Sequence, residues 1–197
     1  MTLPIARLAG LSLALAALPA LAAPRTETAV FAGGCFWTME KGLEHIPGVV
    51  SAVSGYTGGR TAKPSYEDVN TETTGHVEAV KVTFDPDKLS YRQLVDRYWR
   101  MIDPTQSDGQ VCDIAPSYQP IIFVNSPAQR QAAAASKASI DKGGLKGQIK
   151  VPIRDAAAFW PAEAYHQDYA EKNPAAYARY AQGCGRDRRL KEVWAGR

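Results

Sequence analysis

Residues that commonly bind metal ions are scarce in this sequence, which has three cysteines and three histidines among its 197 residues. They are not arranged as zinc ligands usually are, because no Cys-x-x-Cys or His-Glu-x-x-His spacing occurs. His45, His76 and His166 also lie far apart along the chain. We therefore expect no metal site.

An excess of charge of either sign is missing as well, since 23 Lys and Arg residues stand against 20 Asp and Glu residues. Nucleic-acid-binding modules gather basic side chains on one face. Here the first basic cluster is the short run from Arg186 to Lys191, which is typical of a solvated surface. We expect no nucleic-acid partner.

Compositional bias and internal repeats are absent too, with 45% hydrophobic and 22% charged residues. Disordered tails, coiled coils and collagen-like rods all need stronger bias. At this length one globular domain is the natural expectation.

The one long apolar run, residues 8–18, is too short to cross a bilayer as a helix. Arg7 precedes it, Pro19 ends it, and the small residues Ala20-Leu21-Ala22 follow, as at a signal-peptidase site. We expect residues 1–22 to be a signal peptide, removed after Ala22 or Ala23. The mature protein is then exported, periplasmic and not stably inserted in a membrane; a retained N-terminal anchor is the alternative.

Hydrophobic periodicity predicts strands and helices alternating within one unit. The expected strands are 28–32, 49–56, 76–84, 121–124 and 149–153, and the expected helices are 36–46, 89–102, 127–142 and 161–172. Residues 183–197 are punctuated by glycine and predict a packed coil or a mobile tail. The pattern indicates an α+β fold, a single-domain α/β sandwich with a mixed sheet covered by helices.

Cys35 lies where an expected strand ends in Gly33-Gly34 and an expected helix begins. The free N–H groups and the dipole of a helix N-terminus stabilise an anion, so we expect a lowered thiol pKa and a nucleophilic Cys35. Phe36 and Trp37 place two large rings beside it, suited to a small apolar group. The alternative is a buried cysteine in an aromatic core.

Cys35, Cys112 and Cys184 all follow the expected cleavage site, so an odd number of thiols enters an oxidising compartment. This suits redox chemistry in which one thiol attacks and another closes a disulfide onto it. One structural disulfide with one buried free cysteine is the alternative.

Glu78 interrupts an otherwise apolar expected strand. On the inner face of a sheet its pKa would be raised by desolvation, and it could donate a proton near pH 7. The pattern alone favours a solvent-facing Glu78, and Tyr66 and Tyr118 are in themselves ordinary half-buried tyrosines.

From about Val30 to the C-terminus the sequence resembles the A-type methionine sulfoxide reductases, the peptide-methionine (S)-S-oxide reductases. The resemblance rests on ordered motifs: Gly34-Cys35-Phe36-Trp37, Gly55-Tyr56-Thr57-Gly58-Gly59, Pro64-Ser65-Tyr66-Glu67, Thr74-Gly75-His76-Val77-Glu78, Asp103-Pro104-Thr105, Pro116-Ser117-Tyr118 and Pro161-Ala162-Glu163-Ala164-Tyr165-His166-Gln167. It implies a ferredoxin-like plait, with residues 23–182 as the catalytic domain and 183–197 as a tail.

The resemblance also implies a role for each matched residue. Cys35 matches the nucleophile that becomes a sulfenic acid, and Glu78 the acid that protonates the sulfoxide oxygen. Those that contact the substrate are Tyr66 and Tyr118 at the oxygen, Phe36 and Trp37 at the S-methyl group, and Asp113 at the peptide or amino end. His166 and Gln167 belong to a matched motif, where we expect them to pack the C-terminal helix and not to take part in catalysis.

Recycling of the nucleophile needs a second thiol. Glycine-rich tails of the family often carry one, so the resemblance favours Cys184, with Cys112 as the alternative resolving thiol, a second relay thiol or a buried spectator. It implies no cofactor, oxidised proteins and free methionine sulfoxide as substrates, and a thioredoxin-like reductant. We expect a monomer. The Arg186–Lys191 run could then dock an acidic reductant instead of being merely solvated.

Two other functions would use the same residues. A thiol peroxidase also needs a low-pKa cysteine at a helix start, but it needs Arg or Thr near the thiol where this chain has Phe36 and Trp37. A non-catalytic domain could bind apolar peptides through the same rings.

Overall fold

The computed structural model describes residues 25–145 and 148–196. The expected signal peptide and its cleavage site lie outside these residues. Within them, no helix combines the length and apolar character needed to cross a bilayer.

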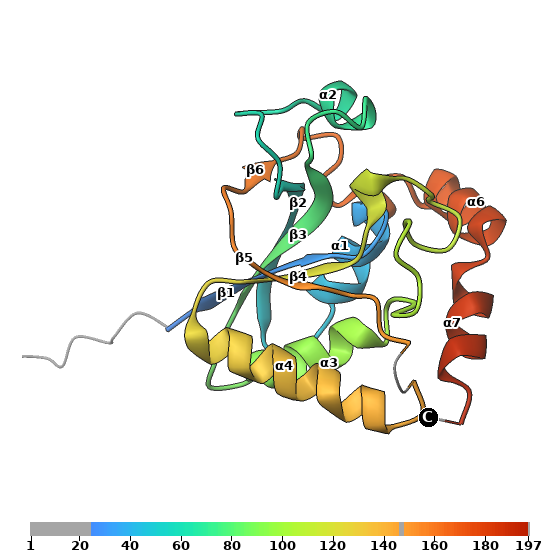
Figure 1. Ribbon diagram of the computed structural model, residues 1–197. Coiled ribbons are helices and arrows are strands. Elements are labelled where there is room, and N and C mark those ends of the chain that lie inside the picture. Colours follow the sequence, from blue (N-terminus) through green and yellow to red (C-terminus); the bar gives the residue numbers. More distant parts are fainter. Residues whose placement is uncertain (1–24, 146–147, 197) are drawn as a thin grey trace, which may run out of the picture.

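A twisted sheet forms the centre of the described chain, in the order β5-β4-β1-β3-β2-β6 (Figure 1). Its strands are β1 (Glu27–Ala32), β2 (Val49–Thr57), β3 (Val77–Phe84), β4 (Ile121–Val124), β5 (Ile153–Asp155) and β6 (Trp160–Pro161). Neighbouring strands pair antiparallel except β4 and β5, which are parallel. The sheet is therefore mixed, as expected.

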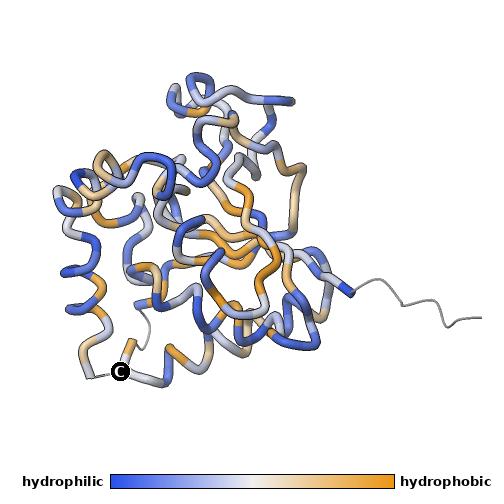
Figure 2. Tube along the Cα trace, turned by 180° about the vertical axis from the view of Figure 1, so that it is seen from behind, coloured by the Kyte–Doolittle hydropathy of each residue, from blue (hydrophilic) through white to orange (hydrophobic). Residues whose placement is uncertain are grey.

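The four central strands have the β-α-β-β-α-β connectivity of a ferredoxin-like fold. Helix α1 (Phe36–Glu44) joins β1 to β2, and α3 (Tyr91–Trp99) joins β3 to β4. Both, with α4 (Pro127–Lys142), bury apolar residues in one cluster with one face of the sheet. Figure 2 shows the apolar strands at the centre and mostly polar segments around them. The predicted fold class is confirmed.

Strand β3 is covered on both faces, which decides the environment of Glu78. Val80 and Val82 lie in the main core with the helices, whereas Val77 and Ala79 lie in a smaller cluster on the opposite face. Because side chains alternate along a strand, Glu78 shares its face with Val80 and Val82. It therefore points towards the helical layer, and the solvent-facing interpretation is wrong.

The predicted helix 161–172 is wrong over most of its length. β6 and a series of turns occupy residues 160–168, and only α5 (Tyr169–Lys172) is helical. The Gln167 side-chain amide donates to Ser54 O and Ala162 O, and Glu40 accepts from the Asp168 N–H. These side-chain bonds to the backbone replace the helical ladder. The expected strand 149–153 likewise forms later, as β5.

The C-terminal residues are helical and not the expected coil. Helix α6 (Pro174–Cys184) and α7 (Arg186–Trp194) are separated by Gly185, whose φ of 68° ends the first helix. They run along one side of the molecule in Figure 1. Trp194 Nε1–H donates to Ile102 O at 3.1 Å and Arg189 pairs with Asp103. Polar bonds from α7 side chains thus hold this helix to the body of the protein.

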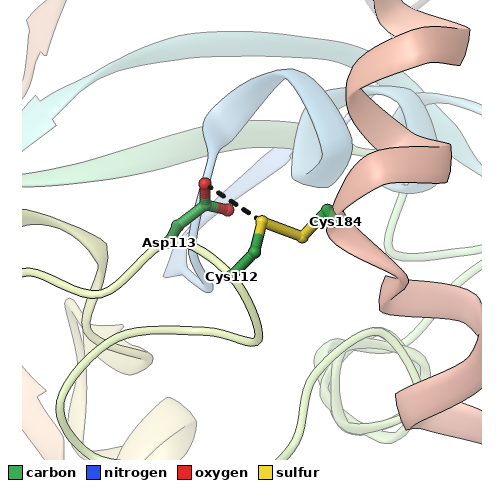
Figure 3. A group of neighbouring side chains, drawn as sticks. All are labelled: Cys112, Asp113 and Cys184. Atoms are coloured by element: carbon green, nitrogen blue, oxygen red, sulfur yellow. Dashed lines mark hydrogen bonds between the residues drawn. A yellow bond between two sulfur atoms is a disulfide. The ribbon is translucent and has the colours of Figure 1, made fainter.

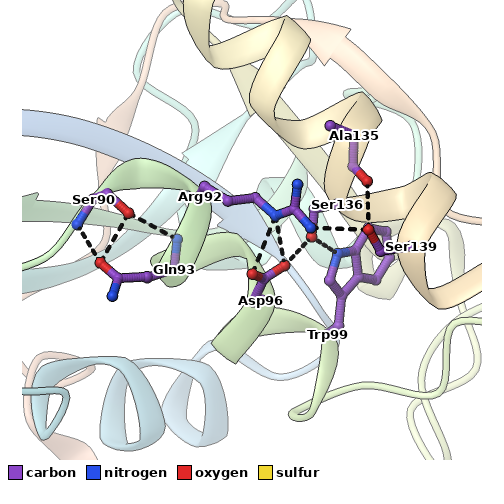
Figure 4. Close-up of polar contacts among 8 residues, drawn as sticks. All are labelled: Ser90, Arg92, Gln93, Asp96, Trp99, Ala135, Ser136 and Ser139. Carbon is purple, nitrogen blue, oxygen red and sulfur yellow. Dashed lines mark hydrogen bonds and ion pairs between the residues drawn. The ribbon is translucent and has the colours of Figure 1, made fainter.

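A polar network joins α3 to α4 (Figure 4). The hydroxyl of Ser136, which is fully buried, donates to Asp96 and accepts from Trp99 Nε1–H at 2.9 Å. Arg92 reaches both Asp96 and Ser139. Ser139 itself lies at the exposed side of the same helix.

Replacing Ser136 by Ala should lower the free energy of unfolding by about 1–3 kcal/mol, because the Trp99 donor and the Asp96 acceptor lose a buried partner. Urea unfolding followed by circular dichroism measures this. Ser139→Ala is the matched control and should change stability by about 0.5 kcal/mol or less. Equal effects of the two changes would show that the buried hydroxyl adds nothing.

Candidate active site

Cys35 is the N-cap residue of α1 and is a buried free thiol. Gly34 before it has a φ of 86°, and a Cβ at this position would lie 2.7 Å from Cβ of Gln110. Glycine is required here both for the backbone conformation and for this close approach. The turn therefore packs directly on the loop that carries Cys112 and Asp113.

The pKa of Cys35 lies above its ordinary value, so the expected lowering is wrong for this environment. Burial is the largest cause and the nearby Glu78 carboxylate adds to it. The backbone N–H of Trp37 and a hydrogen bond with the Tyr180 hydroxyl lower the pKa, but they do not offset burial. Protonation of Glu78 removes its negative charge, which is one of the two main causes of the raised Cys35 pKa.

Glu78 is 2% exposed and accepts a hydrogen bond from the Phe36 N–H at 2.8 Å, in the first turn of α1. Burial raises its pKa to about 8, and repulsion from Asp113 and Glu72 contributes, although the Phe36 N–H acts in the opposite direction. The expectation of a raised pKa is confirmed. At neutral pH this carboxyl group is mainly protonated and can donate a proton.

Tyr118 and Tyr66 approach the same place from different segments. Tyr118 ends the short 3-10 helix η1 (Pro116–Tyr118), where burial raises its pKa and the charges of Glu78 and Cys35 raise it further. Tyr66 opens the five-residue α2 (Tyr66–Asn70), a helix the sequence pattern did not predict, and its N–H donates to Glu163. The charge of Tyr66 also raises the pKa of Tyr118.

Aromatic side chains form a wall beside Cys35. Trp37 stacks on Tyr169 with centroids 3.7 Å apart, and its Nε1–H donates to Nδ1 of His166 at 3.0 Å. The ring of His166 lies 4.9 Å from that of Phe36 and 4.6 Å from that of Tyr66. Burial lowers the pKa of His166, so the ring is neutral at pH 7. His166 thus packs against the wall and fixes the orientation of the Trp37 ring.

Asp113 lies beside the Cys112–Cys184 disulfide (Figure 3) and also binds Tyr180. Its Oδ2 accepts from the Tyr180 hydroxyl at 2.7 Å, and its Oδ1 lies 3.5 Å from Sγ of Cys112. Cys112 is bonded to Cys184, so the structure joins the two thiols that the sequence analysis weighed against each other and leaves Cys35 free. Cys112 is exposed, which excludes a buried spectator.

Tyr180 is the site residue that sequence reasoning missed. It lies four residues before Cys184 on α6, hence on the same helix face, and that spacing was the available signal. The sequence pattern predicts residues 161–172 as the last helix, which leaves Tyr180 outside any predicted helix, and a four-residue spacing places two side chains on one face only within a helix.

Arg186 is buried and not part of a solvated face. Its Nη2 donates to Gly33 O at 2.6 Å and to Met101 O at 2.9 Å. The start of α7 is thereby fixed to the glycine turn before Cys35, two residues after Cys184.

Two groups of potential metal ligands occur among the described residues: Cys112, Asp113 and Cys184, and Glu44, His45 and Glu171. The cysteines of the first are in the disulfide, and a metal binds thiolate. In the second, His45 and Glu171 are exposed.

Comparison with known proteins gives a consistent result. A family model described as "Peptide methionine sulfoxide reductase" matches residues 27–197. Peptide methionine sulfoxide reductase MsrA 2 of Caulobacter vibrioides is 55% identical over 181 residues, 92% of each chain. Reduced Mxr1 from Saccharomyces cerevisiae superposes with a TM-score of 0.72 at 29% identity, over 76% of this chain and 87% of that one. Methionine sulfoxide reductase A of Corynebacterium diphtheriae superposes with a TM-score of 0.68 at 32% identity, over 77% of each chain.

The raised pKa of Glu78 predicts how stability depends on pH. A carboxyl group with an ordinary pKa when unfolded and a pKa of about 8 when folded stabilises the protein below the unfolded value. This contribution is lost as pH rises from about 4.5 through 8. The unfolding free energy of the wild type minus that of Glu78→Gln should therefore fall across this interval and then level off.

Urea titrations at several pH values measure this difference. Gln still accepts from the Phe36 N–H, and the buried Glu40, whose pKa is raised to about 7, is common to both proteins and cancels. A difference that stays constant from pH 5 to 8 would contradict a raised pKa at Glu78.

Proposed function

Because this chain belongs to the peptide methionine sulfoxide reductase family, we propose that it reduces the S-epimer of methionine sulfoxide, in proteins and as the free amino acid, with Cys35 as nucleophile. The observation that carries the proposal is the pairing of a buried free thiol with a largely protonated carboxyl group at one helix N-terminus. Family membership decides against the thiol peroxidase and the non-catalytic peptide binder.

Glu78 is the acid of the first step. A sulfoxide oxygen is a strong acceptor but leaves sulfur only when protonated, and a neutral buried carboxyl group supplies that proton. The Cys35 sulfur attacks the sulfoxide sulfur, the oxygen passes to Cys35 as a sulfenic acid, and methionine leaves with the electron pair. The thiol and the sulfoxide together thus become a sulfenic acid and a thioether.

The remaining site residues position the substrate. The hydroxyls of Tyr66 and Tyr118 hydrogen-bond to the oxygen and stabilise charge on it. Phe36 and Trp37 hold the S-methyl group, which offers no hydrogen bond and is bound by apolar contact alone. The Trp37 ring is fixed for this purpose by Tyr169 and His166.

The Cys112–Cys184 disulfide is the oxidised state that the reductant must reduce. A dithiol protein of the thioredoxin class is suited to this, because one thiolate attacks the disulfide and the second releases the mixed disulfide. A polar pocket of about 770 Å³ beside Cys184 offers access, and Arg188 and Asp108 are among its lining residues. Regeneration then occurs without entry of the reductant into the buried aromatic site.

The enzyme works in the periplasm, exported by residues 1–22. What supports this is the signal-like sequence, in which Arg7 precedes a short apolar run and small residues follow Pro19. Fusion of the full chain to a reporter active only outside the cytoplasm should give signal, and deletion of residues 1–22 should abolish it. Equal signal from both fusions would contradict export.

The reaction itself is tested with the fully reduced protein, excess S-epimer methionine sulfoxide and no reductant. We expect about two methionines per chain in a rapid burst, the first with formation of the Cys112–Cys184 disulfide and the second when the regenerated Cys35 thiol becomes a sulfenic acid that has no free thiol left to attack it. Cys35→Ser should form none, and the R-epimer should give none with either protein. A burst that survives Cys35→Ser, or continued turnover with no dithiol, would contradict the proposed function.

A further inference from the structure

The carboxylate of Asp113 connects the catalytic thiol with the disulfide. Its Oδ2 accepts from the Tyr180 hydroxyl, and the same hydroxyl is hydrogen-bonded to Cys35. Its Oδ1 lies 3.5 Å from Sγ of Cys112 (Figure 3). A sulfur in a disulfide carries no proton, so Cys112 Sγ and Asp113 Oδ1 are in contact without a hydrogen bond while the disulfide is intact. Once the disulfide is reduced, a Cys112 thiol at this position can donate its proton to Oδ1.

The loop that carries Cys112 is held rigidly against the residue before Cys35. Gln110 and Asp113 exchange two backbone hydrogen bonds, of 2.9 and 3.0 Å, and close a tight turn with Cys112 near its tip. The Gln110 side chain is fixed in turn by the backbone of Asp103 and packs on Gly34. Cys112 is therefore positioned by the same contact that shapes the turn before the nucleophile.

Cys184 is placed differently. It ends α6. Its Sγ, the Sγ of Cys112 and a carboxylate oxygen of Asp113 all lie within 4.8 Å of one another. Within the described chain, the sulfur within hydrogen-bonding reach of Asp113 is that of Cys112. The carboxylate thus distinguishes between two thiols that are otherwise close neighbours.

We infer that Asp113 is the general base for the Cys112 thiol, and that Cys112 is the first thiol to attack the sulfenic acid on Cys35, with Cys184 acting second. The inference rests on the proposed function and deepens it. It reverses the order favoured from the sequence, where the resemblance pointed to Cys184 as the thiol that closes onto Cys35.

The step balances in atoms and electrons. Asp113 takes the proton of Cys112, the thiolate attacks the Cys35 sulfur, and the S–O bond breaks as the Cys35–Cys112 bond forms. The departing hydroxide takes a proton through the Tyr180 hydroxyl, which Asp113 resupplies, and leaves as water. Cys184 then attacks Cys112, its proton passes to Cys35, and the products are the Cys112–Cys184 disulfide and a free Cys35 thiol.

The titrating groups that face Asp113 come from every packed element around it. They are Cys35 at the start of α1, Glu78 on β3, Tyr118 in η1, Tyr180 on α6 and Cys112 in its own loop. Among these groups, Tyr180 is hydrogen-bonded to both Asp113 and Cys35. A proton that Asp113 accepts from Cys112 can therefore pass through the Tyr180 hydroxyl to the oxygen that leaves Cys35.

The order of the two thiols is tested by single turnover of the reduced full chain with S-epimer methionine sulfoxide, followed by rapid quenching and peptide mass mapping. Cys184→Ser should accumulate a Cys35–Cys112 disulfide at the rate at which the wild type loses its sulfenic acid. Cys112→Ser should retain the sulfenic acid, trapped as a dimedone adduct on Cys35. A Cys35–Cys184 disulfide formed at that same rate in Cys112→Ser would overturn the inference.

The base is tested by the pH dependence of sulfenic acid loss in Asp113→Asn. An unassisted thiol with a pKa near 8.5 is about 3% ionised at pH 7, so we expect a rate about 30-fold lower at pH 7. The variant rate should rise about tenfold per unit from about pH 6 to 8, whereas the wild-type rate should be nearly flat. Asp87→Asn, a change at an exposed acid in the turn after β3, is the control and should follow the wild type.

A purely structural role for Asp113 would lower the rate without changing its pH profile, and that result would overturn the base assignment. Failure of the proposed function looks different, because the reduced wild type would then release no methionine at all. A normal methionine burst with the wrong disulfide, or with a flat Asp113→Asn profile, refutes this inference alone.

Discussion

The hydrogen bond from the Phe36 N–H to Glu78 is the interaction on which the site depends. It joins the first turn of α1 to the central strand β3, and so brings Cys35 and Glu78 together in a region with little water. Burial disfavours the anion of each, and the two anions also repel. The pair therefore titrates as a coupled unit, in which a proton on Glu78 favours loss of the proton from Cys35. A sulfoxide reduction needs that combination, an acid for oxygen and a nucleophile for sulfur.

The local parts of this arrangement could be predicted from the sequence. A few consecutive residues around Cys35 determine a strand, a two-glycine turn and a helix. The structure contains these elements as predicted. Glu78 was different, because its own strand pattern favoured solvent exposure. Its burial follows from the position of β3 between β1 and β2, with helices on one face and a second cluster on the other. That is a property of the sheet order and not of the strand.

The C-terminal region was the least predictable part, since its order comes from polar side chains bound to distant backbone. Arg186 donates to the carbonyls of Gly33 and Met101, and Gln167 to those of Ser54 and Ala162. Hydrophobic periodicity carries no signal for such bonds, so the sequence suggested a helix where turns occur and a coil where α7 forms. Tyr180 could not be predicted for the same reason, because its hydrogen bond to Asp113 depends on where α6 lies in the fold.

Separation of the reactive thiol from the stored disulfide has a physical consequence for the proposed cycle. Cys35 must stay buried, because desolvation strengthens the hydrogen bonds to the sulfoxide oxygen and raises the pKa of Glu78. A protein reductant, by contrast, must reach sulfur from solvent, and Cys112 is exposed whereas Cys35 is not. A single disulfide on Cys35 would have to meet both demands at one atom. Passing the oxidation through Cys112 to Cys184 meets them at different atoms and returns Cys35 to the free thiol before the reductant arrives, which is the state in which the structure holds it.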